Sequence, residues 1–462
     1  MSTGSKPNIL MIVIDAARAD HFSCYGYPKK TSPFIDEIAA EGVVYENAIS
    51  AAGWTLPSHT SMFTGTYVSK HGVHNENHVF GDELPTMPEV LQKDGYHTVG
   101  FCTNDWLSAA TGLTRGFTEF YNYQFSIFKH KAKRFVNSIF NRGKDSWGYQ
   151  INKDVNSWLK LYDYQKPFFM FVHLNELHLP YQLPAPFNSR FLPEGMTYEE
   201  ASRVNQNPKA FYAGVEKMTE RDFEISRGLY DCAINYSDYR INELYQQLKK
   251  MNVLDDTLLI ITSDHGESIG DHGHFDHYYV LYEALVKVPL IMRYPKVFPS
   301  GTRYKELVQT MDFLPTLKEM LHLNDPELNV MQGVPLPPLN SKTGPREFAI
   351  AERFKDLAGL KKSYPDMDLK HLESWELDRK IAYRTQKYKL ISSENYDSEL
   401  YDIESDPNEL HNLIHEKKDV AENLQKQIEA WRSTFKAAET EGKAADFDDA
   451  MRKRLESLGY LG

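Results

Sequence analysis

Asn8–Asp15, NILMIVID, is an apolar run that ends in a carboxylate. Further apolar runs follow along the chain, separated by Gly- or Asp-rich corners and by helical patterns, at residues 97–102, 168–172, 258–262 and 288–292. Continuous apolar strands that alternate with helices are typical of a mainly parallel sheet whose two faces are both covered. We therefore predict an α/β fold with a mainly parallel central sheet sandwiched by helices.

Polar residues stand at the ends of these runs. Asp15 follows the first run, His173 follows the third, and Asp264 and His265 follow the fourth. Ligands of open α/β sheets gather at the carboxyl ends of the strands. We expect these four side chains to meet at one edge of the sheet.

Composition narrows the classes of partner. The chain of 462 residues has 52 Lys and Arg against 64 Asp and Glu, a formal net charge of −12, which argues against nucleic-acid binding. Only three widely spaced cysteines are present, and the apolar run 9–14 is too short for a signal segment or a membrane span. We expect a cytoplasmic protein without an integral membrane segment, and the oligomeric state stays open.

After residue 340 the long apolar runs give way to short segments of alternating apolar and polar residues. We predict a catalytic unit over residues 6–340, a C-terminal subdomain over 345–437 and a charged tail over 438–462. Within the subdomain, short alternating segments at Arg384–Ile391 and Glu399–Ile403 predict an antiparallel sheet, and a helix is expected near Val420–Ala437. The subdomain is therefore expected to be a small antiparallel α+β unit.

An insertion at about 116–166 contains a basic, aromatic segment, residues 126–140. It is either a lid or membrane-surface helix that attracts anions, or an amphipathic helix with a solvated basic face.

Thr55 starts the segment TLPSHTSMFTG, and Pro57 suits the first turn of a helix. A helix N-terminus favours an oxyanion, and a hydroxyl placed there can act as a nucleophile if a metal or a base withdraws its proton. The alternative is an ordinary helix cap.

Histidines are concentrated between residues 265 and 277, where four histidines and three carboxylates occur within 13 residues. This density after a strand favours metal ligation and acid–base chemistry. Asp264 and His265 are the candidate ligands, whereas His272, His274 and His277 could equally shape the loop. His178, between a strand end and a proline corner, could stabilise a leaving group or only hydrogen-bond that corner.

Together these segments resemble the sulfatase family of the alkaline phosphatase superfamily. The resemblance rests on segments that occur in the family's order. Asn8–Asp15 is similar to the first metal-binding strand, Thr55–Gly65 to the nucleophile signature and Lys70–Val73 to the His-Gly that follows it. Phe168–Tyr181 is similar to the His-Pro-Tyr stretch, Thr262–Glu283 to the second metal motif, Asp312–Leu317 to the DLxPTL helix and Arg384–Leu413 to the C-terminal signatures. The resemblance implies an alkaline phosphatase-like fold and an ester hydrolase whose metal is held by Asp15, Thr55, Asp264 and His265. His178 and His277 would protonate the leaving group or contact an oxyanion, with Asn104 and His71 as weaker candidates.

The departures from the family pattern bear on the chemistry. Sulfatases oxidise a Cys or Ser to formylglycine, but Thr55 carries a methyl group on Cβ and cannot give that aldehyde, so no formylglycine is expected. Ala16 stands where a second metal-binding Asp is usual, His59 replaces the signature Arg, and His265 replaces the usual Asn. An imidazole ligand shifts the preference from Ca²⁺ toward Mn²⁺ or Zn²⁺.

These departures favour the phosphoryl-transfer branch, so the leading prediction is a metal-dependent hydrolase of phosphodiesters or phosphonate monoesters with a Thr nucleophile. The alternatives are a sulfuric ester hydrolase that works without formylglycine, a phospho-group transferase and a non-catalytic metal-binding homologue. The expected partner is a small anionic ester. A second metal among His173, His178, His272 and His274 is a further hypothesis.

Overall fold

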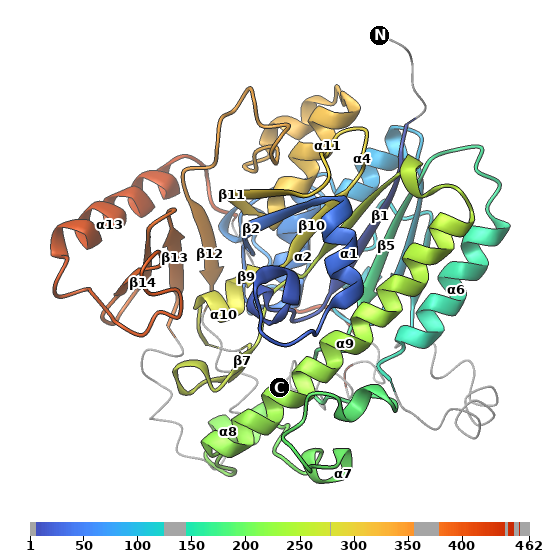
Figure 1. The fold of residues 1–462 in the computed structure, drawn as a ribbon. Coiled ribbons are helices and arrows are strands. Elements are labelled where there is room, and N and C mark those ends of the chain that lie inside the picture. The colour runs from blue at the N-terminus through green and yellow to red at the C-terminus, as the bar shows by residue number, and fades with distance from the viewer. Residues whose placement is uncertain are drawn as a thin grey trace.

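The computed structural model describes residues 6–123, 145–277, 279–354, 378–438, 442–447 and 452. Within these residues a nine-stranded sheet has the order β11-β2-β10-β6-β1-β5-β3-β4, and β9 pairs with β2 (Figure 1). Its strands are β1 Asn8–Ile14, β2 Val43–Ile49, β3 His97–Cys102, β4 Glu119–Asn122, β5 Phe168–Leu174, β6 Thr257–Thr262, β9 Lys287–Val288, β10 Leu290–Arg293 and β11 Thr302–Gln309.

Most strand pairs are parallel, as predicted. Strand β1 pairs in parallel with β5 and β6, and β3 pairs in parallel with β4 and β5. The run 288–292 is different, because it divides into β9 and β10, and β10 is antiparallel to both β6 and β2. The chain leaves β6 at its carboxyl end and re-enters the sheet at that same edge, where Leu290 pairs with Thr262. Without a crossover to the opposite edge, the returning strand must run the other way.

Both faces of the sheet are covered. Leu10, Ile12 and Ile14 of β1 face the core formed with α1 Pro33–Glu41, α6 Gly148–Leu161 and α9 Glu220–Lys250. The alternate β1 residues Ile9, Met11 and Val13 face α2 Thr55–Thr64, α4 Met87–Lys93 and α11 Phe313–Leu321. This alternation explains why the strand sequence is apolar throughout.

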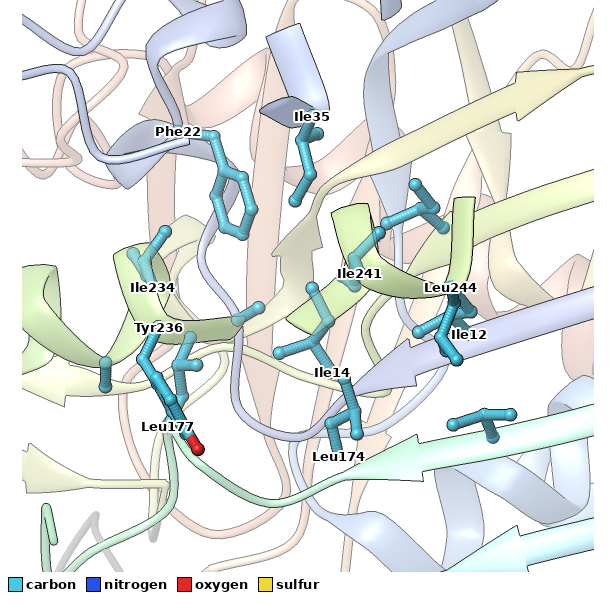
Figure 2. Packing of buried hydrophobic residues seen from close by; sticks show 14 of the residues in the cluster. Ile12, Ile14, Phe22, Ile35, Leu174, Leu177, Ile234, Tyr236, Ile241 and Leu244 are labelled. Atoms are coloured by element: carbon cyan, nitrogen blue, oxygen red, sulfur yellow. The ribbon is translucent and has the colours of Figure 1, made fainter. Parts of the chain in front are cut away.

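The first of these cores is built by the longest helix. Figure 2 shows Ile241 and Leu244 of α9 beside Ile12 and Ile14 of β1, with Leu174 of β5 next to them. Burial of side chains of this size is worth about 1.5–3 kcal/mol each. The packing therefore holds the carboxyl ends of β1 and β5 in fixed positions, and these ends carry the polar residues predicted to meet.

The C-terminal subdomain is a four-stranded antiparallel sheet of β12 Ala349–Arg353, β13 Lys380–Arg384, β14 Tyr388–Ser393 and β15 Glu399–Asp402. It lies beside the β2 and β11 end of the main sheet, with α13 Lys418–Ser433 outside it (Figure 1). The predicted antiparallel sheet and helix are confirmed. The segment Arg384–Ile391 is not one strand, however. The Thr385 hydroxyl accepts a hydrogen bond from the Tyr388 amide and donates one to the Tyr388 carbonyl, which stabilises a turn between β13 and β14.

Shorter elements complete the described residues: α3 Val68–His71, α7 Tyr198–Ala201, α8 Pro208–Tyr212 and α10 Glu283–Val286, with a hairpin of β7 Ser268–Ile269 and β8 Phe275–Asp276. The ends of the predicted insertion belong to the fold, since β4 extends the sheet and α6 packs through Ile151 and Val155. The basic segment 126–140 lies outside the described residues. No helix of the described residues is long and apolar enough to cross a membrane.

The final described segment, 442–447, lies against the catalytic unit. The ring of Phe447 is 5.6 Å from that of Trp106, and the His78 amide donates a hydrogen bond to the Lys443 carbonyl. Residues 442–447 of the predicted tail are therefore packed on the sheet-bearing region.

Candidate metal and catalytic site

The four polar residues at the strand ends meet, as predicted. Asp15, His173, Asp264 and His265 are all completely buried. His265 Nε2 lies 3.5 Å from Asp15 Oδ1 and 3.5 Å from Asp264 Oδ2, and His173 Nε2 lies 3.5 Å from Asp15 Oδ2. The parallel register of β5, β1 and β6 thus places two carboxylates and two imidazoles together at one edge of the sheet.

Thr55 reaches this cluster from the first turn of α2, as Pro57 indicated. Its Oγ1 lies 3.4 Å from His265 Nε2 and 3.4 Å from Asn104 Nδ2. Asn104 also donates a hydrogen bond of 2.9 Å to Asp15 Oδ2, so this amide bridges the hydroxyl and the carboxylate. Asn104 follows β3, the strand beside β5. The candidate nucleophile therefore stands at a helix N-terminus and faces the carboxylate and imidazole cluster.

The strand end that carries Asp264 is held by two serines. The hydroxyls of Ser50 and Ser58 donate hydrogen bonds of 2.5 and 2.6 Å to the Asp264 carbonyl. Because Ser58 lies on α2, in the same helix as Thr55, its hydrogen bond connects the helix that carries the candidate nucleophile to the carboxyl end of β6. The separation between Thr55 and Asp264 is thereby set by hydrogen bonds rather than by a free loop.

Burying two carboxylates together has an electrostatic cost. Burial and the neighbouring charge of Asp264 raise the pKa of Asp15 to about 7. Burial also acts to raise the pKa of Asp264, but His265, His59 and His173 lower it to about 2. A cation between the two carboxylates would offset this repulsion.

The donor set fits a divalent cation. Among the described residues, Asp15 Oδ1 and Asp264 Oδ2 are buried oxygens without a hydrogen-bond partner. Asp15, Asp264 and His265 each offer a ligand atom within 4.8 Å of the others. His265 Nδ1 is bound to the Gly266 carbonyl at 2.8 Å, which leaves Nε2 directed to the carboxylates, the arrangement usual for a metal-binding histidine.

His277 and His178 lie beside this cluster. The His277 ring is 4.5 Å from that of His265 and 5.1 Å from that of His178. His277 Nδ1 is 2.5 Å from Asp276 Oδ1 and 3.5 Å from Glu267 Oε1. Burial acts to lower the pKa of His277, but these two carboxylates raise it well above its usual value. His277 is therefore equipped to carry a proton into the site.

Sequence reasoning did not assign Glu267, Asp276 or His59 to the site. The first two meet through the β7–β8 hairpin, which pairs Ser268 with Asp276. His59 lies one helical turn after Thr55, with its Nδ1 2.9 Å from the Thr55 carbonyl and 3.6 Å from Asp264 Oδ2. The i, i+4 spacing of Thr55 and His59 is the signal that could have identified it.

Several candidates lie elsewhere. The His272 ring stacks on Tyr282 at 3.8 Å, and the His274 imidazole lies 3.3 Å from the Tyr212 hydroxyl, so the structure gives these two rings partners outside the Asp15–Asp264–His265 cluster. Asp271 forms an ion pair of 2.6 Å with Arg18. His71 Nε2 is 3.0 Å from Ser61 Oγ, and its Nδ1 accepts from the Val73 amide, which gives this ring a structural role.

Comparison with known proteins confirms the family resemblance seen in the sequence. The family model described as Sulfatase matches residues 7–323, and the model described as N-sulphoglucosamine sulphohydrolase, C-terminal, matches residues 270–434. The chain is 25% identical to an N-acetylglucosamine-6-O-sulfatase of Bacteroides thetaiotaomicron, over 88% of this chain and 83% of that protein. It is 24% identical to an arylsulfatase of Clostridium perfringens, over 97% of both chains. The crystal structure of a phosphonate monoester hydrolase of Agrobacterium radiobacter superposes with a TM-score of 0.73 at 20% identity, over 93% of this chain and 96% of that one.

Proposed function

Because the chain belongs to the sulfatase family, we propose that it hydrolyses sulfate esters with the unmodified Thr55 hydroxyl as nucleophile. The two curated relatives named above are sulfatases, and they support this reaction better than the phosphodiester or phosphonate ester hydrolysis that the sequence placed first. The observation that carries the proposal is the position of Thr55 Oγ1, 3.4 Å from both His265 Nε2 and Asn104 Nδ2.

Asp15, Asp264, His265 and Thr55 would hold the metal. A divalent cation bound there supplies Lewis acidity, which lowers the pKa of the Thr55 hydroxyl and offsets charge on the ester oxygens. Two carboxylates with an imidazole suit Mn²⁺ or Zn²⁺ better than Ca²⁺, which prefers oxygen ligands alone.

The chain's own groups then complete the reaction. Once its hydroxyl proton has passed to solvent, Thr55 Oγ1 forms a bond to sulfur while the bond from sulfur to the ester oxygen breaks, and the departing alkoxide takes a proton from His277. Asp276 and Glu267 hold that proton on His277 beforehand. Water then attacks the sulfur of the sulfo-threonine and gives one proton to the now neutral His277. The bond from sulfur to Thr55 Oγ1 breaks, and the remaining proton returns to Thr55 as sulfate leaves. Asn104 orients Thr55 throughout, and His178 stands beside His277 at the leaving-group side.

A second candidate is hydrolysis of a phosphodiester or phosphonate monoester at the same site. The residue at position 55 favours it, because threonine cannot be oxidised to the formylglycine aldehyde of sulfatases and its hydroxyl is suited to attack phosphorus directly. Transfer of the bound group to another alcohol, in place of water, would use the same residues. A non-catalytic homologue would bind the cation and turn over none of these esters.

The test compares p-nitrophenyl sulfate with bis-p-nitrophenyl phosphate and p-nitrophenyl phenylphosphonate, each with added Mn²⁺ or Zn²⁺. We expect the highest kcat/KM on the sulfate ester and its loss in Thr55→Ala. Thr60→Ala is the matched control, since this buried hydroxyl lies on the same helix and donates a hydrogen bond of 2.8 Å to the Leu56 carbonyl, away from the cluster. A preference for either phosphorus ester would replace the main proposal by the second candidate, and full activity in Thr55→Ala would overturn both.

A further inference from the structure

A second group of buried ligand side chains adjoins the Asp15–Asp264–His265 set. His59, His173 and Asp264 each offer a ligand atom within 4.8 Å of the others, and all three residues are completely buried. They come from three separate parts of the chain, since His59 lies on α2, His173 on β5 and Asp264 two residues after the end of β6. Three independent parts of the fold therefore converge on one point.

The orientation of His173 repeats that of His265. His173 Nδ1 lies 3.3 Å from Thr103 Oγ1, and its Nε2, 3.5 Å from Asp15 Oδ2, makes no hydrogen bond within the described residues. In His265 likewise, Nδ1 is bound to a neighbouring oxygen and Nε2 is directed to the carboxylates. An imidazole anchored through one nitrogen, with the other left for a ligand, is the pattern of metal-binding histidines.

His59 completes the group. Its Nδ1 donates to the Thr55 carbonyl at 2.9 Å and lies 3.6 Å from Asp264 Oδ2, so the lone pair for a ligand is on Nε2, which has no hydrogen-bond partner in the described part of the chain. The rings of His59 and His173 are 5.3 Å apart and tilted by 52°, so they are not stacked. Asp264 Oδ2, which faces both His59 and His265, is also without a hydrogen-bond donor among those residues.

Unpartnered atoms of this kind are costly. A buried polar atom left without a partner destabilises the fold, and native proteins contain few of them. Here His59 Nε2, His173 Nε2 and Asp264 Oδ2 are concentrated in one cluster of completely buried residues. A single bound cation would satisfy the cluster, whereas apolar packing could not.

We propose that His59, His173 and Asp264 bind a second divalent transition-metal ion, with Asp264 shared between this ion and the one held by Asp15 and His265. Two imidazoles and one carboxylate form a donor set for Zn²⁺, Mn²⁺ or Co²⁺ and disfavour Ca²⁺ and Mg²⁺. Two divalent cations against the two carboxylates would leave the site positive and so attract an anionic ester despite the acidic chain. The proposal does not depend on which ester is cleaved.

Metal stoichiometry tests it without any substrate. The full chain is stripped with a chelator, reloaded with Co²⁺ or Zn²⁺, dialysed and analysed for metal per chain by mass spectrometry. We expect two ions in the wild type and one in His59→Ala and in His173→Ala. His21→Ala is the matched control, because this buried histidine is bound to Asp231 at 2.8 Å outside the cluster, and it should retain two ions.

Electron paramagnetic resonance of the Mn²⁺-loaded wild type gives a readout that does not require a variant to fold. Two Mn²⁺ ions that share a carboxylate are expected to give a spin-coupled spectrum, whereas isolated Mn²⁺ gives a six-line spectrum. One ion per chain in the wild type with only the six-line signal would overturn the second site, even if ester hydrolysis is observed. Two ions with the coupled signal would support it, even if none of the esters is cleaved.

Discussion

Two of the buried clusters of charged groups among the described residues receive their positive charge in different ways. The first, the metal-site cluster, has Asp15 and Asp264 facing the imidazoles of His59, His173 and His265. The second, the lysine cluster, has Glu283 and Glu409 on either side of Lys389, at 3.1 and 2.8 Å from its Nζ. Arg384 Nε lies 3.5 Å from Glu283, and every side chain of the lysine cluster is at most 7% exposed.

The difference lies in the source of the positive charge. In the lysine cluster the chain supplies its own cations, Lys389 and Arg384, and the cluster joins α10 to β13 and β14. In the metal-site cluster the carboxylates meet imidazoles whose pKa values burial lowers, to about 3 for His173. Neutral imidazoles donate lone pairs rather than charge. The carboxylates of the lysine cluster are therefore balanced by the chain's own cations, whereas those of the metal-site cluster need a cation from solution.

The largest effect should come from removing the carboxylate shared by both ligand groups. Asp264→Asn keeps the shape of the side chain but removes its negative charge, so we expect loss of bound metal and a fall in kcat/KM of roughly 10³-fold or more. Metal analysis and steady-state kinetics measure the two quantities. Glu283→Gln makes the same change in the lysine cluster and should leave the metal content at the wild-type value. Equal metal content in the two variants would contradict the comparison.

Next in size is the removal of the lysine cluster's own cation. Lys389→Met leaves Glu283 and Glu409 buried without that charge, and breaking a buried pair in this way costs about 3–5 kcal/mol of unfolding free energy. Urea denaturation near pH 7 measures it. Lys387→Met, two residues earlier and half-exposed beside Asp402, should cost less than about 1 kcal/mol. Similar losses in both variants would show that Lys389 is no more than a surface charge.

The sequence was sufficient for those parts of the site that are local to a strand end or a helix start. Asp15 directly follows an apolar strand, Asp264 and His265 come within three residues of the end of another, and Thr55 precedes a proline suited to a helix start. The direction of a strand and its pairing with distant strands were harder to predict. The residues of an apolar run such as 288–292 do not indicate which way the strand runs in the sheet, so its antiparallel direction is known only from the structure.

Contacts made through hairpins and between subdomains were also beyond sequence reasoning. Glu267 and Asp276 meet because β7 pairs with β8, and Lys389 meets Glu283 across 106 residues of chain. Nothing in the local sequence distinguishes these charged residues from solvated ones. His59 could be predicted in part. Its spacing of four residues from Thr55 places both on one side of a helix, but only the fold shows that Asp264 lies next to His59.

A smaller effect is expected when metal is withdrawn from the wild type. A ligand that binds only the folded state adds about 2.7 kcal/mol when its free concentration is 100 times its Kd, so a chelator should lower Tm by a few degrees and Zn²⁺ or Mn²⁺ should restore it. Differential scanning calorimetry measures the shift. Lys389→Met should have a lower Tm but the same decrease in Tm on chelation. In Asp264→Asn the chelator should change Tm much less than in the wild type. A wild-type Tm insensitive to chelator and to added metal would argue against a cation-completed cluster.

The smallest effect concerns acid. Burial acts to raise the pKa of Glu283, but Lys389 and Arg384 lower it to about 2 from an ordinary value of 4.5. A lowered pKa means that the ionised form stabilises the fold, so this contribution is present above about pH 4.5 and is lost as the pH falls toward 2. Burial raises the pKa of Glu409 to about 7, so Glu409 is protonated in both states below pH 4.5 and does not add to the slope there. The unfolding free energy of Glu283→Gln should therefore fall less steeply than that of the wild type between pH 4.5 and 2.5, by on the order of 2 kcal/mol. Glu422→Gln, at an exposed position of α13, should keep the wild-type slope, and a slope unchanged in Glu283→Gln would mean that Lys389 does not hold this carboxylate ionised.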